Sequence, residues 1–233
     1  MKQFSNRYIF IFSSVMVIAV AALLSLAATL LQPAQTRNLE IEKKRNMLES
    51  INVAATRENT ADLYGKYIKE GFVINSRGEM IEGVDAFSVV LRNEQKKPLA
   101  EQYLPVFRAV PDDGEQVVIL PVEGKGLWGP IFGYISLRSD MNTIYGVNFD
   151  HKGETPGLGA EINTSAFESQ FRGKKLYDNT DFISVHVVKG GAREGDVHGV
   201  DAISGGTITS KGLEMMIHDC MLKYNDFLLK NRN

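Results

Sequence analysis

A long apolar segment stands near the amino terminus of the chain. Residues Tyr8 to Leu31 contain no charged side chain. As a helix this segment is about 36 Å long, which is enough to cross a hydrocarbon core of about 30 Å with some tilt. Lys2 and Arg7 precede the segment, and Pro33 follows it and discourages continuation of a helix. The pattern therefore predicts one transmembrane helix within residues 1–35.

A cleaved secretory signal is the alternative interpretation, because the small residues from Ser25 to Ala28 resemble a cleavage region. The apolar run is longer than the core of about 7–15 residues that is usual for a signal peptide, and this favours a retained anchor. The basic residues Lys2 and Arg7 favour a cytoplasmic amino terminus. The rest of the chain is then expected outside the cytoplasm.

The remaining chain changes from helical to strand-like patterns and back. Spaced apolar residues in 37–70 predict two helical pieces that are joined near residues 56–60. Short apolar runs separated by turn-forming residues then predict strands and hairpins, at residues 72–74, 80–81, 117–122, 131–137, 144–149 and 182–188. Apolar residues from Leu213 to Leu228 recur at three- and four-residue spacings, which predicts one long C-terminal helix packed on a sheet. We therefore expect a single α+β domain in residues 36–233.

Composition narrows the chemistry that is open to this chain. The net charge is −2 and no long block of one charge is present, so a nucleic-acid-binding surface is not indicated. Cys220 is the single cysteine, which excludes an intramolecular disulfide, a Cys-x-x-Cys pair and a thiolate-ligated iron–sulfur cluster. The histidines have no metal-ligand spacing, so we expect no metal site. Any redox chemistry must come from a bound cofactor.

The segment Asp201–Ser210 stands directly before the predicted C-terminal helix. Gly205 and Gly206 allow positive φ angles and a close approach of the backbone to a ligand, and a helix amino terminus offers unpaired N–H groups. This geometry suits a phosphate, although an ordinary helix cap has the same composition. The segment lacks the Gly-Lys-Ser/Thr ending of a P-loop. Its hydroxyl groups belong to Ser204, Thr207, Thr209 and Ser210, of which the last two are candidate caps.

Two further elements carry unusual composition. Residues 153–161 read Gly-Glu-Thr-Pro-Gly-Leu-Gly-Ala-Glu, which is a turn that a simple hairpin connection would also explain. Residues 126–134 contain Trp128, the single tryptophan, and residues 187–192 end a strand with Lys189-Gly190-Gly191. By itself Trp128 fits either a core position or a place beside an aromatic ligand.

Residues 201–207 resemble the flavinylation motif, Asp-x-x-Ser/Thr-Gly-Ala-Thr, of proteins that carry FMN on the last threonine through a phosphoester bond. This resemblance implies that FMN is attached to Thr207 by a separate flavin transferase, which uses FAD and a divalent metal. Members of the family mostly have alanine where Gly206 stands. The resemblance also places Ser204, Gly205, Gly206 and Thr209 at the cofactor site.

Residues 154–159 are similar to a second signature of FMN-binding domains, Glu-Thr-Pro-Gly-Leu-Gly, which packs against the isoalloxazine ring. The two motifs stand in the family's order. This resemblance adds Glu154, Thr155, Gly157, Leu158 and Gly159 to the expected flavin site. From the remaining elements it adds Trp128 and Lys189.

Nearly the whole chain resembles the C subunits of sodium-translocating NADH:quinone reductases, with the specific motifs between Gly126 and Ser210. The resemblance implies an FMN-carrying subunit that relays electrons from NADH towards quinone, coupled to Na⁺ export. It implies a single-pass protein of the bacterial inner membrane with a periplasmic domain, whose partners are the other subunits and which has no turnover alone. The alternatives are the G subunit of an Rnf-type ferredoxin:NAD oxidoreductase and a tethered non-redox module that binds a phosphate-bearing ligand.

Overall fold

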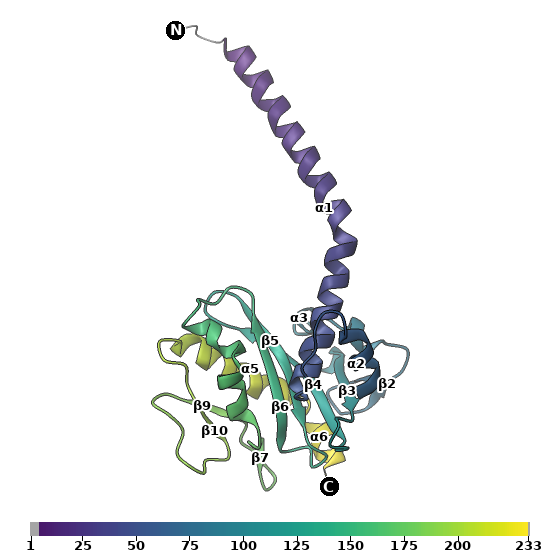
Figure 1. The fold of residues 1–233 in the computed structure, drawn as a ribbon, viewed down its shortest axis with the longest axis vertical. Helices are drawn as coiled ribbons and strands as arrows, with labels where there is room; N and C mark the ends of the chain where they lie inside the picture. The colour runs from purple at the N-terminus through teal and green to yellow at the C-terminus, as the bar shows by residue number, and fades with distance from the viewer. Residues whose placement is uncertain (1–4, 233) are drawn as a thin grey trace. The chain divides into compact units, whose positions relative to one another are not determined.

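The computed structural model describes residues 5–232 (Figure 1). The chain divides into two compact units, one on each side of the bond between Lys43 and Lys44. The helices are α1 (Asn6–Ser50), α2 (Thr60–Tyr67), α3 (Leu91–Glu94), α4 (Ser165–Glu168), α5 (Thr207–Lys223) and α6 (Asn225–Asn231), with 3₁₀ turns η1 (Ala86–Ser88), η2 (Leu99–Glu101), η3 (Gly159–Asn163) and η4 (Ser169–Phe171). The strands are β1 (Ile68–Ile74), β2 (Met80–Ile81), β3 (Leu104–Ala109), β4 (Val117–Lys125), β5 (Pro130–Leu137), β6 (Ile144–His151), β7 (Tyr177–Asp178), β8 (Asp181–Phe182), β9 (His186–Val188) and β10 (Gly199–Asp201).

The N-terminal unit consists of the first part of α1. Among residues 5–232, α1 is the helix that is long and apolar enough to cross a membrane. Its large apolar side chains are exposed, that of Phe10 to 75%, as expected for a helix whose apolar surface needs another covering. The prediction that the helix ends near Pro33 was wrong, because α1 continues through Pro33 to Ser50. A proline removes one backbone hydrogen bond, and the turns on either side sustain the helix.

The second unit is built on a six-stranded antiparallel sheet with the order β2-β1-β3-β4-β5-β6. Strand β4 has apolar residues on both faces. Val118 and Leu120 belong to the core on one face of the sheet, and Val117 and Ile119 belong to the core on the other. A strand buried on both faces is apolar without alternation, which explains the continuous run at residues 117–122.

Helices cover both faces of this sheet. Leu213, Ile217 and Met221 of α5 pack in the core on one face. The last turns of α1 cover the other face with Met47 and Leu48. The structure therefore confirms the predicted fold, a long apolar N-terminal helix followed by an α+β domain.

Two local predictions were wrong. Residues 182–188 are divided between β8 and β9, because Ser184 has a φ of 68°, and a residue in the left-handed region cannot continue a strand. Strand β9 instead pairs in parallel with β10. The C-terminal segment forms two helices that meet at Tyr224, whose hydroxyl donates a hydrogen bond to the Pro105 carbonyl at 3.0 Å.

Strand β3 was absent from the predicted set because Pro105 interrupts it. A proline has no N–H to donate to a neighbouring strand. Pairing of β3 with β4 begins at Phe107, so Pro105 lies beyond the part of β3 that is paired on both sides. The strand therefore tolerates the proline.

Candidate functional site

A cavity of about 230 Å³ lies at the amino terminus of α5. Three segments form it: the β4–β5 hairpin turn, the turn that follows β6, and the loop between β10 and α5. The fold therefore brings together the two motifs that stand far apart in the sequence. The lining residues are Leu127, Glu154, Thr155, Leu158, Gly159, Gly205, Gly206, Thr207, Ile208 and Thr209.

Four residues expected at the site do not line this cavity. Ser204 is exposed in the loop before α5, Gly157 forms the left-handed position of its turn with a φ of 75°, and Lys189 is exposed beyond β9. Trp128 follows the lining residue Leu127 in the chain, and its side chain is 69% exposed. The core interpretation of Trp128 is therefore wrong.

Two lining residues, Leu127 and Ile208, were missed by the sequence reasoning. Each stands next to a residue that was chosen, Trp128 and Thr207 respectively. The missed signal was an apolar side chain within a polar or glycine-rich turn. Both side chains are largely exposed in the structure.

The amino terminus of α5 lacks a side-chain cap. Its N-cap residue is Gly206, and the first helical hydrogen bond runs from Ser210 N to the Gly206 carbonyl at 2.9 Å. The prediction that Thr209 or Ser210 caps the helix was wrong, because both lie inside its first turn. The N–H groups of this turn and the positive end of the helix dipole are therefore available to an anion.

The four hydroxyl groups differ in accessibility. Thr207 and Ser204 are exposed, whereas Thr209 and Ser210 are only 1% and 2% exposed. The buried pair is committed to the fold: Thr209 donates to Glu154, and Ser210 Oγ accepts a hydrogen bond from Ile203 N at 3.2 Å. An external reagent can reach Thr207 or Ser204 but not the buried pair.

Glu154 is a buried carboxylate in the wall of the cavity, 5% exposed. Its Oε1 accepts a hydrogen bond from the backbone N–H of Trp128 at 2.9 Å, and its Oε2 accepts one from Thr209 Oγ1 at 2.5 Å. Glu154 thus connects all three segments of the site.

The glycine loop packs closely against Leu158. Gly205 has a φ of 73°, and a Cβ there would lie 2.5 Å from Leu158 Cδ2. Gly206 has an ordinary φ of −98°, but a Cβ there would lie 2.9 Å from Ile203 Cγ2. Because Gly205 and Gly206 have no Cβ, the backbone and its N–H groups can come close to the cavity. A phosphate-binding loop requires this arrangement.

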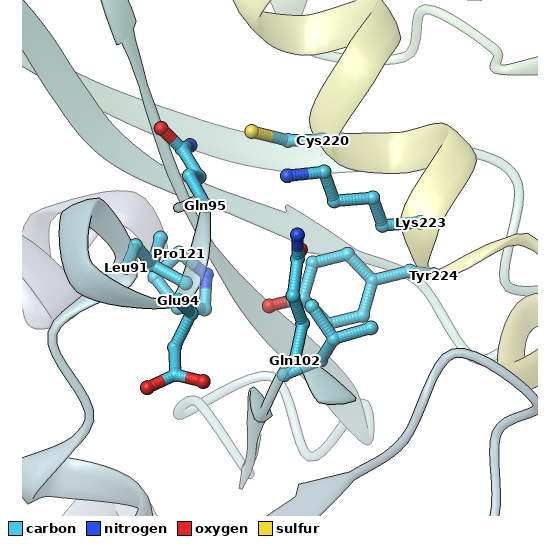
Figure 2. Close-up of a pocket in the computed structure, with 9 residues that line it drawn as sticks. Leu91, Glu94, Gln95, Gln102, Pro121, Cys220, Lys223 and Tyr224 are labelled. Atoms are coloured by element: carbon cyan, nitrogen blue, oxygen red, sulfur yellow. The ribbon is translucent and has the colours of Figure 1, made fainter. Parts of the chain in front are cut away.

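A second cavity lies beside the second half of α5, and Figure 2 shows Cys220 and Lys223 projecting into it from that helix. Its volume is about 10 Å³, which is room for about one water molecule. Burial raises the pKa of the Cys220 thiol, so this cysteine is an unreactive core residue. Within residues 5–232 no group of three or more His, Cys, Asp or Glu side chains is arranged to hold a metal ion.

Comparison with known proteins identifies the class. Residues 126–221 match the family model of the FMN-binding domain, and this range contains every residue that lines the cavity at the amino terminus of α5. The α+β domain is therefore an FMN-binding domain, and its residues fit the phosphate-bearing cofactor.

Related proteins identify the family. The C subunit of the Na(+)-translocating NADH-quinone reductase of Vibrio anguillarum is 34% identical, with 82% of this chain and 81% of that protein covered. Its counterpart from Vibrio parahaemolyticus is 31% identical with the same coverage. This chain belongs to the family of these C subunits, which confirms the resemblance found in the sequence.

Solved structures agree. The crystal structure of the C subunit of the Na(+)-translocating NADH-quinone reductase from Parabacteroides distasonis has a TM-score of 0.78 and 44% identity, and the match covers 85% of this chain and 96% of that one. Shewanella oneidensis NqrC has a TM-score of 0.72 and 30% identity, with 85% and 98% covered. These relatives favour the C-subunit assignment over the Rnf-type and non-redox alternatives.

Proposed function

We propose that this chain is the FMN-carrying C subunit of a membrane-bound Na⁺-translocating NADH:quinone reductase and that FMN is joined to Thr207 through a phosphoester bond. One observation carries the attachment site. Two exposed hydroxyl residues line the cavity, Thr155 and Thr207, and of these Thr207 stands at the first position of the uncapped helix, where the backbone N–H groups can hold a phosphate. Ser204 is equally accessible but lies outside the lining.

The residues of the site have distinct roles in this proposal. FMN, when bound, supplies the electron transfer. The N–H groups of the first turn of α5 hold the phosphate, and the helix dipole stabilises its charge. Leu127, Leu158 and Ile208 offer apolar surface to the flavin ring, and Thr155 offers a hydroxyl. A separate flavin transferase forms the bond, since an exposed threonine is accessible to an enzyme.

The apolar part of α1 anchors the domain in the bacterial inner membrane, with residues 36–233 on the periplasmic side. The length and the exposed apolar side chains of the helix support the anchor, and the basic residues before it support the orientation. NADH and quinone react at other subunits, which are the partners of this chain. The isolated chain therefore has no turnover.

The test is co-expression of the full chain with its flavin transferase. The wild-type protein should remain fluorescent on a denaturing gel and should have gained the mass of FMN less one water. Thr207→Ala and Thr207→Val should lack the adduct, while Ser204→Ala should keep it. Thr207→Ser should keep part of it, because the oxygen remains although the side chain is less restrained.

Peptide mapping completes this test. An adduct on a peptide in which only Ser204 or Thr209 is available would show that the attachment site is wrong. A wild-type protein that loses all flavin on denaturation would instead refute the covalent bond. Circular dichroism of each variant shows whether the domain is folded.

A further inference from the structure

Glu154 is a buried charge without a cation. Among residues 5–232 it takes part in no ion pair with Lys, Arg or His. Both of its oxygens accept hydrogen bonds, from Trp128 N and from Thr209 Oγ1. Both carboxyl oxygens are therefore engaged, each by a different segment of the site.

The surrounding backbone is shaped to admit this carboxylate. A Cβ at Gly126 would lie 2.5 Å from Glu154 Oε1, and a Cβ at Gly159 would collide with Glu154 Oε2 and with the Thr209 hydroxyl. Two segments thus lack side chains at the points where they meet Glu154. A buried charge costs several kcal/mol unless the protein solvates it, and at Glu154 the two hydrogen bonds and the close backbone approach provide that solvation.

We propose that Glu154 is a positioning residue that holds the Trp128 turn against α5 and that its fixed negative charge lowers the reduction potential of the flavin bound beside it. The first role follows from its two hydrogen bonds to different segments. The second rests on the proposed function. Reduction adds negative charge to a flavin, and a buried anion in the same cavity opposes that change more strongly than it would in water.

Three variants separate charge from position. Glu154→Gln removes the charge and keeps an oxygen for Trp128 N. Glu154→Asp keeps the charge but is one methylene too short to contact both partners. Glu161→Gln is the matched control, because Glu161 lies in the same turn, accepts a hydrogen bond from Gly157 N at 3.0 Å and does not line the cavity.

The charge is tested by the midpoint potential of the flavin in the full chain, measured by spectroelectrochemical titration in detergent. Glu154→Gln should shift the potential to a less negative value, while Glu154→Asp should stay closer to wild type. Glu161→Gln should leave the potential unchanged. An unchanged or more negative potential in Glu154→Gln overturns the electrostatic role, and so does an equal shift in Glu161→Gln.

The positioning role is tested without flavin. Trp128 is the single tryptophan of the chain, so fluorescence anisotropy of the protein made without its flavin transferase reports on this turn alone. Glu154→Asp should lower the anisotropy, and Glu154→Gln and Glu161→Gln should retain it. Anisotropy of Glu154→Asp equal to wild type overturns the positioning role.

Different results would refute the attachment of FMN to Thr207 and the role of Glu154. Mass spectrometry of the wild-type protein from cells with the transferase tests the adduct on Thr207. An absent adduct refutes the proposed attachment, and the anisotropy comparison still decides the role of Glu154. A present adduct with an unchanged potential refutes only the electrostatic role.

Discussion

Adjacent glycines before α5 should respond very differently to the same substitution. Gly205 has a φ of 73°, in the left-handed region, whereas Gly206 has a φ of −98°, which alanine adopts freely. A Cβ at Gly205 would also lie 2.5 Å from Leu158 Cδ2, while one at Gly206 would lie 2.9 Å from Ile203 Cγ2. We therefore expect Gly205→Ala to be more destabilising than Gly206→Ala.

Two opposing effects determine how much each substitution changes the free energy of unfolding. A left-handed conformation costs a residue with a Cβ about 1–2 kcal/mol. Replacing glycine with alanine also restricts the unfolded chain, which stabilises the fold by about 0.4–1 kcal/mol. Gly205→Ala should therefore lose about 1 kcal/mol of unfolding free energy, with some displacement of Leu158. Gly206→Ala gains the second effect and has no left-handed backbone to strain, but its Cβ would press on Ile203 Cγ2 and Cβ at 2.9 and 3.1 Å, so it should lose less stability than Gly205→Ala.

Urea unfolding of the full chain in detergent, followed by far-UV circular dichroism, measures this difference. Flavin attachment gives a second readout, since related flavinylation motifs mostly carry alanine at the position of Gly206. Gly206→Ala should keep the adduct in full, and Gly205→Ala should reduce it. Equal losses of stability in the two variants, or a larger loss in Gly206→Ala, would refute the backbone argument.

Three other variants and one reporter fusion each test a different part of the structure. Thr209→Ala should keep the adduct but lose about 1–3 kcal/mol of stability on urea unfolding, because it leaves Glu154 Oε2 without its donor. Burial raises the pKa of Glu168 to about 7, so the folded state binds that proton more tightly than the unfolded chain does. The unfolding free energy should fall as pH rises from about 4.5 to about 7, and Glu168→Gln should flatten this profile. Leu158→Ala should alter the flavin absorption spectrum while leaving attachment largely intact. Reporters fused to the C-terminus should be active only as extracytoplasmic reporters, and cytoplasmic labelling of that end would contradict the topology.

The sequence predicted the elements of the fold better than their boundaries. Apolar runs identified β4 and β5, which are central strands, and β6, which is an edge strand whose residues 144–149 are nevertheless buried. The ends depend on single backbone angles, such as the φ of 68° at Ser184 that separates β8 from β9. Serine is not a residue that marks such an angle, so sequence patterns do not reveal it. At β3 the sequence pattern misled in the other direction: Pro105 argues against a strand, although the structure has one there.

The candidate site was predicted from motifs, and their spatial relation was not. Nothing in the spacing of residues 154–159 and 201–207 requires them to meet. Their contact depends on α5 packing across the sheet beside the turn after β6, and on Glu154 reaching Thr209. The sequence also cannot distinguish an accessible hydroxyl from a buried one within four residues, whereas the structure separates Thr207 from Thr209 by burial.

The shape of the cavity gives a physical reason for the proposed covalent bond. Pockets that hold a small molecule without a bond usually bury about 70–90% of its surface, but here Leu127, Leu158 and Ile208 are each more than 40% exposed at the rim. A flavin ring against such exposed side chains would gain less from apolar burial than in an enclosed pocket. Under the proposed function, the phosphoester at Thr207 would retain the flavin whatever the strength of those contacts. An electron carrier needs an accessible flavin, because each of its partners must approach the flavin closely.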